Sequence, residues 1–179
     1  SLLSAIVSLL TFMSEERLAD IVFWSMGNLE QYGTTKVMIV IPVLIVGFVM
    51  LMAYTRELNA IMIGDAHAMD LGVDVSKIRF RLLIATSLVT AACVSFVGVI
   101  GFVGLVIPHI FRLLIGPDNR YLVPFSMFGG ATFLLICDYI SRMGLISAGL
   151  VPIGIITSLI GAPYFIYLLK RRKSEVGWN

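Results

Sequence analysis

Charged residues are scarce in this sequence of 179 residues: Asp, Glu, Lys and Arg together make up 13% of it, against about 25% in an ordinary soluble domain. Hydrophobic residues make up 59%, and the mean hydropathy is +0.98. A water-soluble domain of this length must cover its surface with polar groups, and 13 basic and 11 acidic residues are too few for that. The composition therefore excludes a soluble enzyme, a nucleic-acid-binding protein and a disordered segment. It indicates lipid as the solvent for much of the chain.

Residues that carry chemistry are also few. Cys93 and Cys137 lie inside apolar runs without the spacing of metal ligands, so they are interpreted as small buried hydrophobic residues. His109 follows Pro108 in an apolar setting with no second ligand nearby, which favours a packed histidine over a metal ligand. His67 lies in a polar loop and is assigned no chemistry. Because the sequence holds no nucleophile–base pair, metal-ligand cluster or nucleotide motif, we predict no catalytic residue, no metal and no cofactor.

The sequence opens at Ser1 inside an apolar run, with no positively charged segment before it. We therefore expect no signal peptide at this position, and we expect the sequence to be a fragment or a processed chain whose natural N-terminal portion is missing.

Long stretches without charge predict helices that cross a membrane. Residues 37–55 form one such stretch, and 19 residues of helix span about 28 Å, close to one bilayer core. We expect about five spans, which comprise residues 1–13, 37–55, 78–99, 121–142 and 152–169. Shorter helices are expected at 16–26, on the membrane surface, and at 105–114. The predicted fold is an all-α, polytopic membrane protein, with residues 1–179 as one transmembrane domain.

The distribution of Lys and Arg predicts the orientation. If the segment 170–173 is cytoplasmic, alternating spans place ten basic residues inside and three outside, the outside ones being Arg17, Lys36 and Arg142. Cytoplasmic loops carry such an excess of Lys and Arg. The prediction is a multi-pass protein of the cell (inner) membrane with a cytoplasmic C-terminus.

The longest polar interruption defines a cytoplasmic loop at residues 56–78. Residues 64–72 are predicted to form a very short helix, with Asp65 as its N-cap and Gly72 as the left-handed residue after its last turn. A second short helix is expected at 57–63, and Ser76 is expected to cap the next span.

This loop contains small and apolar residues where water is expected, among them Ala66, Ala68, Met69 and Leu71. A compact apolar face on a short helix suits insertion into a groove of another protein. The same face could instead cover the helix ends of its own chain, and the sequence leaves both interpretations open.

Several blocks of the sequence carry a family resemblance. The segment Arg56-x-Leu58-Asn59, followed by Gly64-Asp65-x-x-Ala68-x-x-Leu71-Gly72-Val73, resembles the coupling loop of the FecCD-type permease subunits of type II ABC importers. Further blocks in the same order also resemble this family: they are Gly98-x-x-Gly101-Phe102-Val103-Gly104 through Pro108-His109-Ile110-x-Arg112, Gly116-x-Asp118-x-Arg120, Asp138-x-x-x-Arg142, and Pro152-x-Gly154 through Gly161-Ala162-Pro163-x-Phe165. One departure is Leu150, where the family usually has Glu.

The resemblance implies the C-terminal half of a ten-helix permease that imports an iron-siderophore, haem, cobalamin or a similar metal chelate. It implies a separate ABC ATPase, an external substrate-binding protein and a second permease copy as partners, besides the lipid bilayer. Contact with the ATPase is assigned to Gly64, Asp65, Ala66, Ala68, Met69, Leu71 and Gly72. Arg142 is assigned to docking of the binding protein, although an ion pair with Asp138, four residues earlier on the same helix face, is an equally simple interpretation.

The glycine-rich run is interpreted as a break between helices. Gly98, Gly101, Gly104 and Pro108 follow a predicted span and precede no Lys-Ser/Thr pair, so they do not form a phosphate-binding loop. We assign them to a hinge or to close helix packing.

Two other classes of function stay open at this point. A secondary transporter or channel would act without an ATPase, but such proteins usually place ionisable residues in mid-span, where this sequence has few. A purely structural membrane protein is the third possibility.

Overall fold

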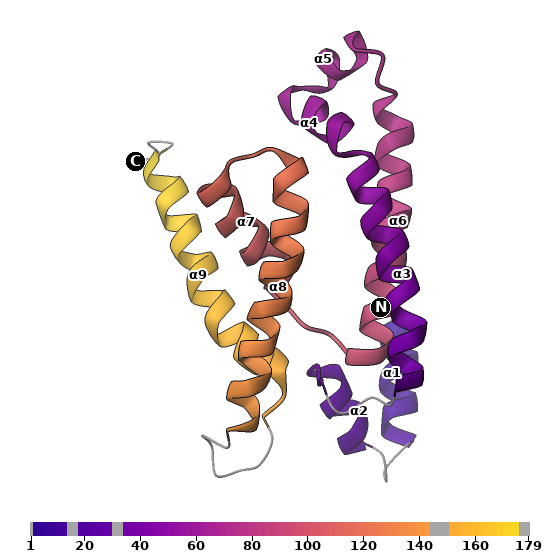
Figure 1. Ribbon diagram of the computed structural model, residues 1–179. Helices are drawn as coiled ribbons and strands as arrows, with labels where there is room; N and C mark the ends of the chain where they lie inside the picture. Colours follow the sequence, from indigo (N-terminus) through magenta and orange to yellow (C-terminus); the bar gives the residue numbers. More distant parts are fainter. Residues whose placement is uncertain (1, 14–17, 30–33, 144–150, 176–179) are drawn as a thin grey trace.

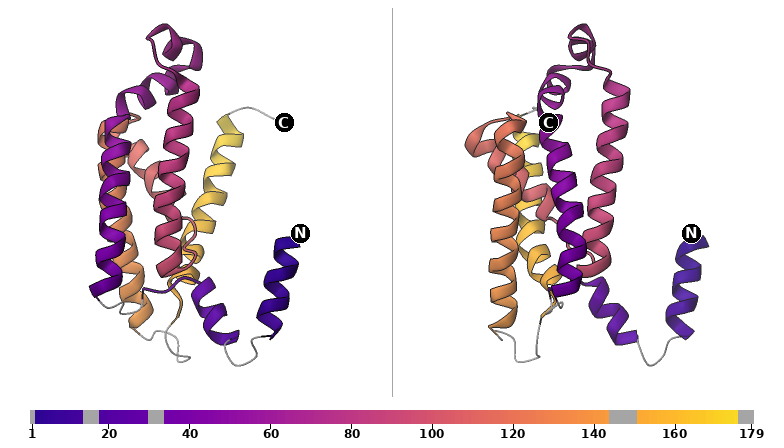
Figure 2. Two further views of the ribbon diagram at one scale, coloured as in Figure 1. Left: turned by 90° about the vertical axis from the view of Figure 1, so that its right-hand side faces the viewer. Right: turned by 45° about the vertical axis from the view of Figure 1, so that its right-hand side comes forward.

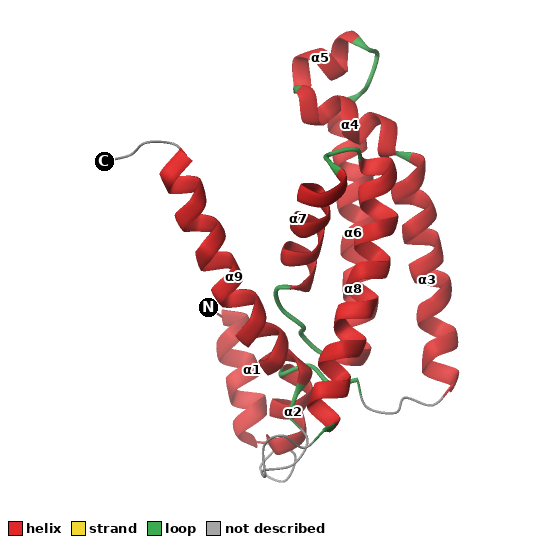
Figure 3. Cartoon of the chain, turned by 60° about the vertical axis from the view of Figure 1, so that its left-hand side comes forward, coloured by secondary structure: helices red, strands yellow, loops and turns green. Residues whose placement is uncertain are grey.

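In the computed structural model, residues 2–13, 18–29, 34–143 and 151–175 are described. Helices connected by short loops make up this part of the chain, with no strand (Figure 3). They are α1 (Leu2–Met13), α2 (Leu18–Ser25), α3 (Thr34–Ala53), α4 (Thr55–Ile63), α5 (Asp65–Asp70), α6 (Val75–Val97), α7 (Val103–Ile115), α8 (Asn119–Arg142) and α9 (Ile153–Glu175). The all-α prediction is confirmed.

Two of the described helices, α6 and α8, are long and apolar enough to cross a membrane. A third span results if α3 and α4 count together, since Val37–Ala53 and Thr55–Ile63 meet at a bend of 51°. Shorter apolar helices are Leu2–Met13, Val103–Ile115 and the stretch Ile153–Leu168 of α9. The expected total of about five spans includes α1 and α9, whose apolar stretches belong to this shorter group.

The helices pack mainly as neighbours in the chain. α3 lies along α6, α7 lies along α8, and α9 lies beside both α7 and α8 (Figures 1 and 2). α7 stays short because the chain leaves helical geometry between Gly98 and Phe102, both of which have positive φ. The predicted break between two helices therefore lies at residues 98–102.

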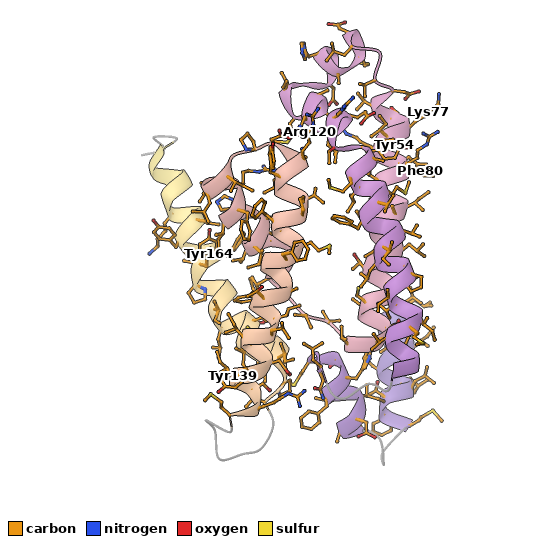
Figure 4. All side chains as sticks on the ribbon, viewed as in Figure 1. Tyr54, Lys77, Phe80, Arg120, Tyr139 and Tyr164 are labelled. Atoms are coloured by element: carbon orange, nitrogen blue, oxygen red, sulfur yellow. The ribbon has the colours of Figure 1, made fainter. Side chains whose placement is uncertain are left out.

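Labelled basic residues lie at one end of the helical assembly (Figure 4). α4, α5 and the α7–α8 turn lie at one end, where Lys77 and Arg120 are also found, whereas Tyr139 and the end of α8 lie at the other (Figure 4). Arg142, the last residue of α8, is therefore remote from the main group of basic residues. Which of the two ends faces the cytoplasm stays a prediction.

The buried core is small. It comprises short patches on α5 to α9, such as Ile78 and Leu82 on α6 and Val106 on α7, while α1 has no buried residue. Large apolar side chains are exposed along most of the helices. Apolar surface on this scale suits contact with lipid or with further protein.

Candidate functional site

The α4–α5 arm, residues 55–70, projects beyond the ends of α7, α8 and α9 (Figure 1). It leaves α3 at Tyr54, where Thr55 is buried and its hydroxyl donates to the carbonyl of Met52 at 2.9 Å. Gly64 separates α4 from α5 with φ 154° and ψ 147°, a conformation that favours glycine. The sequence-predicted pair of short helices is therefore present, joined at this corner.

The C-terminus of α5 is closed by two backbone hydrogen bonds. The N–H of Val73 donates to the carbonyl of Ala68 at 3.0 Å, and the N–H of Gly72 donates to Met69 at 2.9 Å. This pairing is a Schellman motif, which requires a left-handed residue at Gly72, and its φ is 81°. The conformation predicted for Gly72 is confirmed, and it gives the six-residue helix a defined end.

The predicted N-caps are wrong. Gly64, not Asp65, precedes α5, and the carboxylate of Asp65 instead pairs with the guanidinium of Arg79 on α6 at 2.8 Å. Asp74, not Ser76, caps α6: its carboxylate accepts from the backbone N–H of Lys77 at 3.1 Å and pairs with the Lys77 ammonium at 2.8 Å. Asp74 lies three residues before that N–H, the spacing a capping side chain needs. These bonds lower the pKa of Asp74 below its usual value.

α5 has an inner and an outer side. Ala68 is completely buried, whereas Met69 and Leu71 are 59% and 63% exposed. Ala66 and His67 are exposed as well. Ala68 therefore packs on its own chain, as one interpretation of the apolar loop expects. The larger side chains Met69 and Leu71 stay exposed, and their insertion into a partner stays a prediction.

The base of the arm is hydrogen-bonded to the start of α8. The Asn59 amide donates to the carboxylate of Asp118 at 2.7 Å, and its oxygen accepts from the backbone and side chain of Asn119 at 2.9 and 2.7 Å. Asp118 also caps α8 by accepting from the N–H of Arg120 at 3.0 Å. Asn59 and Asp118 both stand in blocks of the family resemblance, but no pattern in the sequence predicts this contact between them.

The bonds to Arg120 and Asn59 lower the pKa of Asp118. Since the pKa is lower in the folded state, these bonds stabilise it at neutral pH. Their contribution is lost only in acid, below the ordinary value of 3.8, as the pH falls through the lowered pKa.

Arg142 at the opposite end is bonded to its own helix and to the segment after α2. Its Nε donates to Asp138 at 2.9 Å, as the four-residue spacing predicts, and its Nη2 donates to the carbonyl of Leu29 at 2.8 Å. The side chain of Arg142 is still 42% exposed. It therefore ties α8 to the segment after α2 while presenting a positive charge at this end. Leu150, the other residue in question here, lies outside the described residues.

Gly98 lies in a tight junction of three segments. The N–H of Asn28 donates to Val97 at 2.9 Å, while the N–H groups of Ile153 and Gly154 donate to Gly27 and Met26, each at 3.1 Å. The segment after α2 thus lies between the end of α6 and the start of α9. Two otherwise unpaired N–H groups of the α9 N-terminus are satisfied there by backbone carbonyls.

The other members of the glycine-rich run lie in different surroundings. A Cβ on Gly101 or Gly104 would meet no atom within 4 Å in the described part of the chain. Pro108 lies inside α7 and contributes to the wall of a groove between helices. The ring of His109 lies edge to face with that of Tyr164, with 6.4 Å between the two ring centroids. This contact agrees with a packed histidine, and Figure 4 shows Tyr164 on α9.

A cavity of about 650 Å³ opens beside the first half of α9, next to the glycine junction. Its walls are mostly apolar, with Ser25 and Ser158 among the few polar residues. No group of three or more His, Cys, Asp or Glu side chains able to hold a metal is found among the described residues.

Residues 1–171 match the FecCD transport family. The chain is 44% identical over 173 residues to the cobalamin import system permease protein BtuC of Halobacterium salinarum. This alignment covers 97% of the chain and 46% of that protein. The chain is also 36% identical over 176 residues to the hemin transport system permease protein HmuU of Yersinia pestis. That alignment covers 98% of the chain and 52% of HmuU. The chain thus spans about half the length of the curated relatives it matches.

The fold is also similar to a solved structure described as an inward-facing conformation of a metal-chelate type ABC transporter. The TM-score is 0.85 at 35% identity, and the match covers 95% of this chain and 55% of the other.

Proposed function

Because the chain belongs to the FecCD transport family, we propose that it forms part of the membrane-spanning permease of an ATP-driven importer, with the α4–α5 arm as its contact for a separate ATPase subunit. The observation that carries the proposal is the arm itself. It projects from the helical assembly (Figure 1) and is anchored through Ala68 and Asn59, while Met69 and Leu71 stay exposed. A soluble partner could bind these side chains, and the anchors would pass its movement to the helices.

The proposed orientation places the arm in the cytoplasm. The end of the helical assembly that carries the arm also carries many basic residues, together with the last turns of α9. These basic residues are Arg56, Lys77, Arg79, Arg81 and Arg120. In this orientation the chain obeys the positive-inside rule. ATP is hydrolysed on the cytoplasmic side, so the arm would meet its ATPase there.

The proposed substrate is a metal chelate such as a corrinoid or haem, because relatives similar over nearly the whole chain are import proteins for cobalamin and hemin. Neither of these two relatives is named for an iron-siderophore, so we do not assign that substrate. The largely apolar cavity beside α9 suits passage of a large ligand without strong binding. A second permease copy is proposed to complete the pathway around α9.

Labelling and capture together test this proposal. Met69→Cys in a native transporter whose other accessible cysteines are removed is expected to react with an impermeant maleimide in inside-out vesicles stripped of the ATPase, and not in intact cells. The ATPase subunit should protect it and should co-purify with the wild-type permease. Labelling from outside intact cells, or a permease purified without any ATPase, would contradict the proposed function.

At the opposite end we propose that Arg142 contributes to docking of an external binding protein. Arg142→Glu should reduce the association rate about tenfold at low ionic strength and less at high salt, because charges at the rim of an interface act mainly on association. Surface plasmon resonance with the reconstituted permease would measure the rate.

Arg142→Gln is the matched control for this change, since it removes the charge without reversing it and should give an intermediate rate. Identical association rates for both variants and the wild type at every salt concentration would limit Arg142 to its bonds with Asp138 and Leu29.

A further inference from the structure

The α3–α6 pair and the α7–α8 pair enclose a groove of about 720 Å³. It is lined mainly by apolar side chains, such as Phe48 from α3, Val89 from α6 and Met127 from α8. Across this groove α3 packs against α8 much less than α3 packs against α6 or α7 packs against α8. The relative position of the two pairs therefore depends on the contacts at the two ends of the groove.

At the arm end the contact combines packing of α4 on α8 with polar bonds, and most of these bonds are made by Asn59, while the sulfur of Met62 accepts one more from the Asn119 amide at 3.2 Å. The Asn59 side chain reaches from α4, which continues α3 after the bend, to the first turn of α8. The side-chain hydrogen bonds of Asn59 all go to the start of α8: Nδ2 donates to Asp118, and Oδ1 accepts two bonds from Asn119. Asn119 is only 9% exposed and also lines the groove. Water therefore competes poorly for the two bonds that Asn119 donates to Asn59.

The polar contact between the arm and α6 is an exposed ion pair. Asp65 pairs with Arg79 on α6, but their side chains are 47% and 59% exposed, and exposed ion pairs contribute little. α6 is also held to α3 by packing along its length. The arm consequently needs no special tie to move the α3–α6 pair, whereas its connection to α8 depends on the packing of α4 and a few polar groups.

We propose that Asn59 is a positioning residue that makes α8 move with the α4–α5 arm. This inference rests on the proposed function and specifies how it operates. A displacement of the arm by the ATPase reaches the α3–α6 pair through the chain itself. It reaches α8 through the Asn59 bonds, which enter at the cap of the helix. Without them the arm would keep only the weak Met62 sulfur bond and its packing on α8, so α8 would follow the arm less closely than the α3–α6 pair does.

The donor and acceptor pattern allows a sharp test in the native transporter, reconstituted in liposomes with its ATPase. Asn59→Asp places a second carboxylate against Asp118 and removes the donor, so substrate transported per ATP hydrolysed should fall at least tenfold. Asn59→Ala removes the bonds without adding a charge and should reduce the same ratio. Asp118→Asn keeps an acceptor for both Asn59 and the N–H of Arg120, so its ratio should stay within about threefold of the wild type.

The double change Asn59→Asp with Asp118→Asn restores the pattern in reverse. The new amide at 118 can donate to the new carboxylate at 59, which still accepts from Asn119. The transport ratio of the double variant should recover to within about threefold of the wild type. Such a recovery would not occur if Asn59→Asp simply prevented the chain from folding.

Different failures have different meanings. If Asn59→Asp or Asn59→Ala transports with the wild-type ratio, or if the double variant is monodisperse and yet stays as low as Asn59→Asp, the positioning role is overturned. A wild-type permease that captures no ATPase would instead overturn the proposed function itself.

Discussion

Gly98→Ala is expected to destabilise the folded chain by about 3 kcal/mol or more. Gly98 has φ 74° and ψ −166°, a region occupied almost only by glycine, and forcing another residue into it costs about 1–3 kcal/mol. A Cβ at this position would in addition overlap the carbonyl oxygen of Trp24 and lie 3.2 Å from the Cα of Gly27. Both neighbours are backbone atoms, so no side chain can rotate away.

The junction around Gly98 has little freedom to relax. Moving residues 24–28 away would stretch the bond from Asn28 to Val97 and the bonds from Ile153 and Gly154 to the same segment. Gly27 itself has φ 76° and would place a Cβ 2.9 Å from the carbonyl oxygen of Val99. The cost of one methyl group therefore spreads to α2, α6 and the start of α9.

Thermal unfolding of the purified protein in detergent would measure the effect, with a decrease of the midpoint on the order of 10 °C expected for Gly98→Ala. Gly101→Ala and Gly104→Ala are matched controls in the same run. Neither position has a positive φ or an atom within 4 Å of its Cβ in the described part of the chain. Gly104 lies in the first turn of α7. In a helix, alanine is more stable than glycine by about 0.5–1 kcal/mol. Equal midpoints for all three variants would contradict the junction described here.

The contrast within this run shows how far sequence reasoning reaches. Spacing and composition indicated that a helix ends near Gly98 and a shorter one follows, because apolar periodicity and glycine act locally. They did not identify the partner of Gly98, because residues 24–28 are about 70 positions earlier in the chain. Gly98, Gly101 and Gly104 are alike in sequence, and only the folded backbone distinguishes the crowded one.

The polar contacts follow the same division. The pair Asp138–Arg142 was predictable because a helix brings residues four apart to one face. The bonds from Asn59 to Asp118 and Asn119 join residues about 60 positions apart, and no periodicity encodes them. Capping failed for a different reason: Asp65, Asp74 and Ser76 all have suitable side chains, and the position of each helix start decides which one caps.

Leu71→Asp should abolish capture of the ATPase, with affinity reduced at least about 100-fold. Leu71 is 63% exposed at the end of α5, and burying a leucine side chain at an interface stabilises it by about 1.5–3 kcal/mol. Aspartate loses that contribution and adds a carboxylate that must be desolvated, so the total loss is about 3 kcal/mol, or roughly 100-fold in affinity. Titration of the labelled ATPase onto the reconstituted permease measures this change.

Ser76→Asp is the matched control for Leu71→Asp. It adds the same charge five residues away, on the exposed first turn of α6, where acidic side chains are favoured near a helix N-terminus. Its affinity for the ATPase should therefore stay within about threefold of the wild type. Because Leu71 is exposed and Gly72 closes α5 through backbone bonds, Leu71→Asp should leave the melting midpoint unchanged. If both variants lost the ATPase equally, general electrostatic repulsion would explain the loss. If Leu71→Asp bound it like the wild type, the exposed side of α5 would not be the contact.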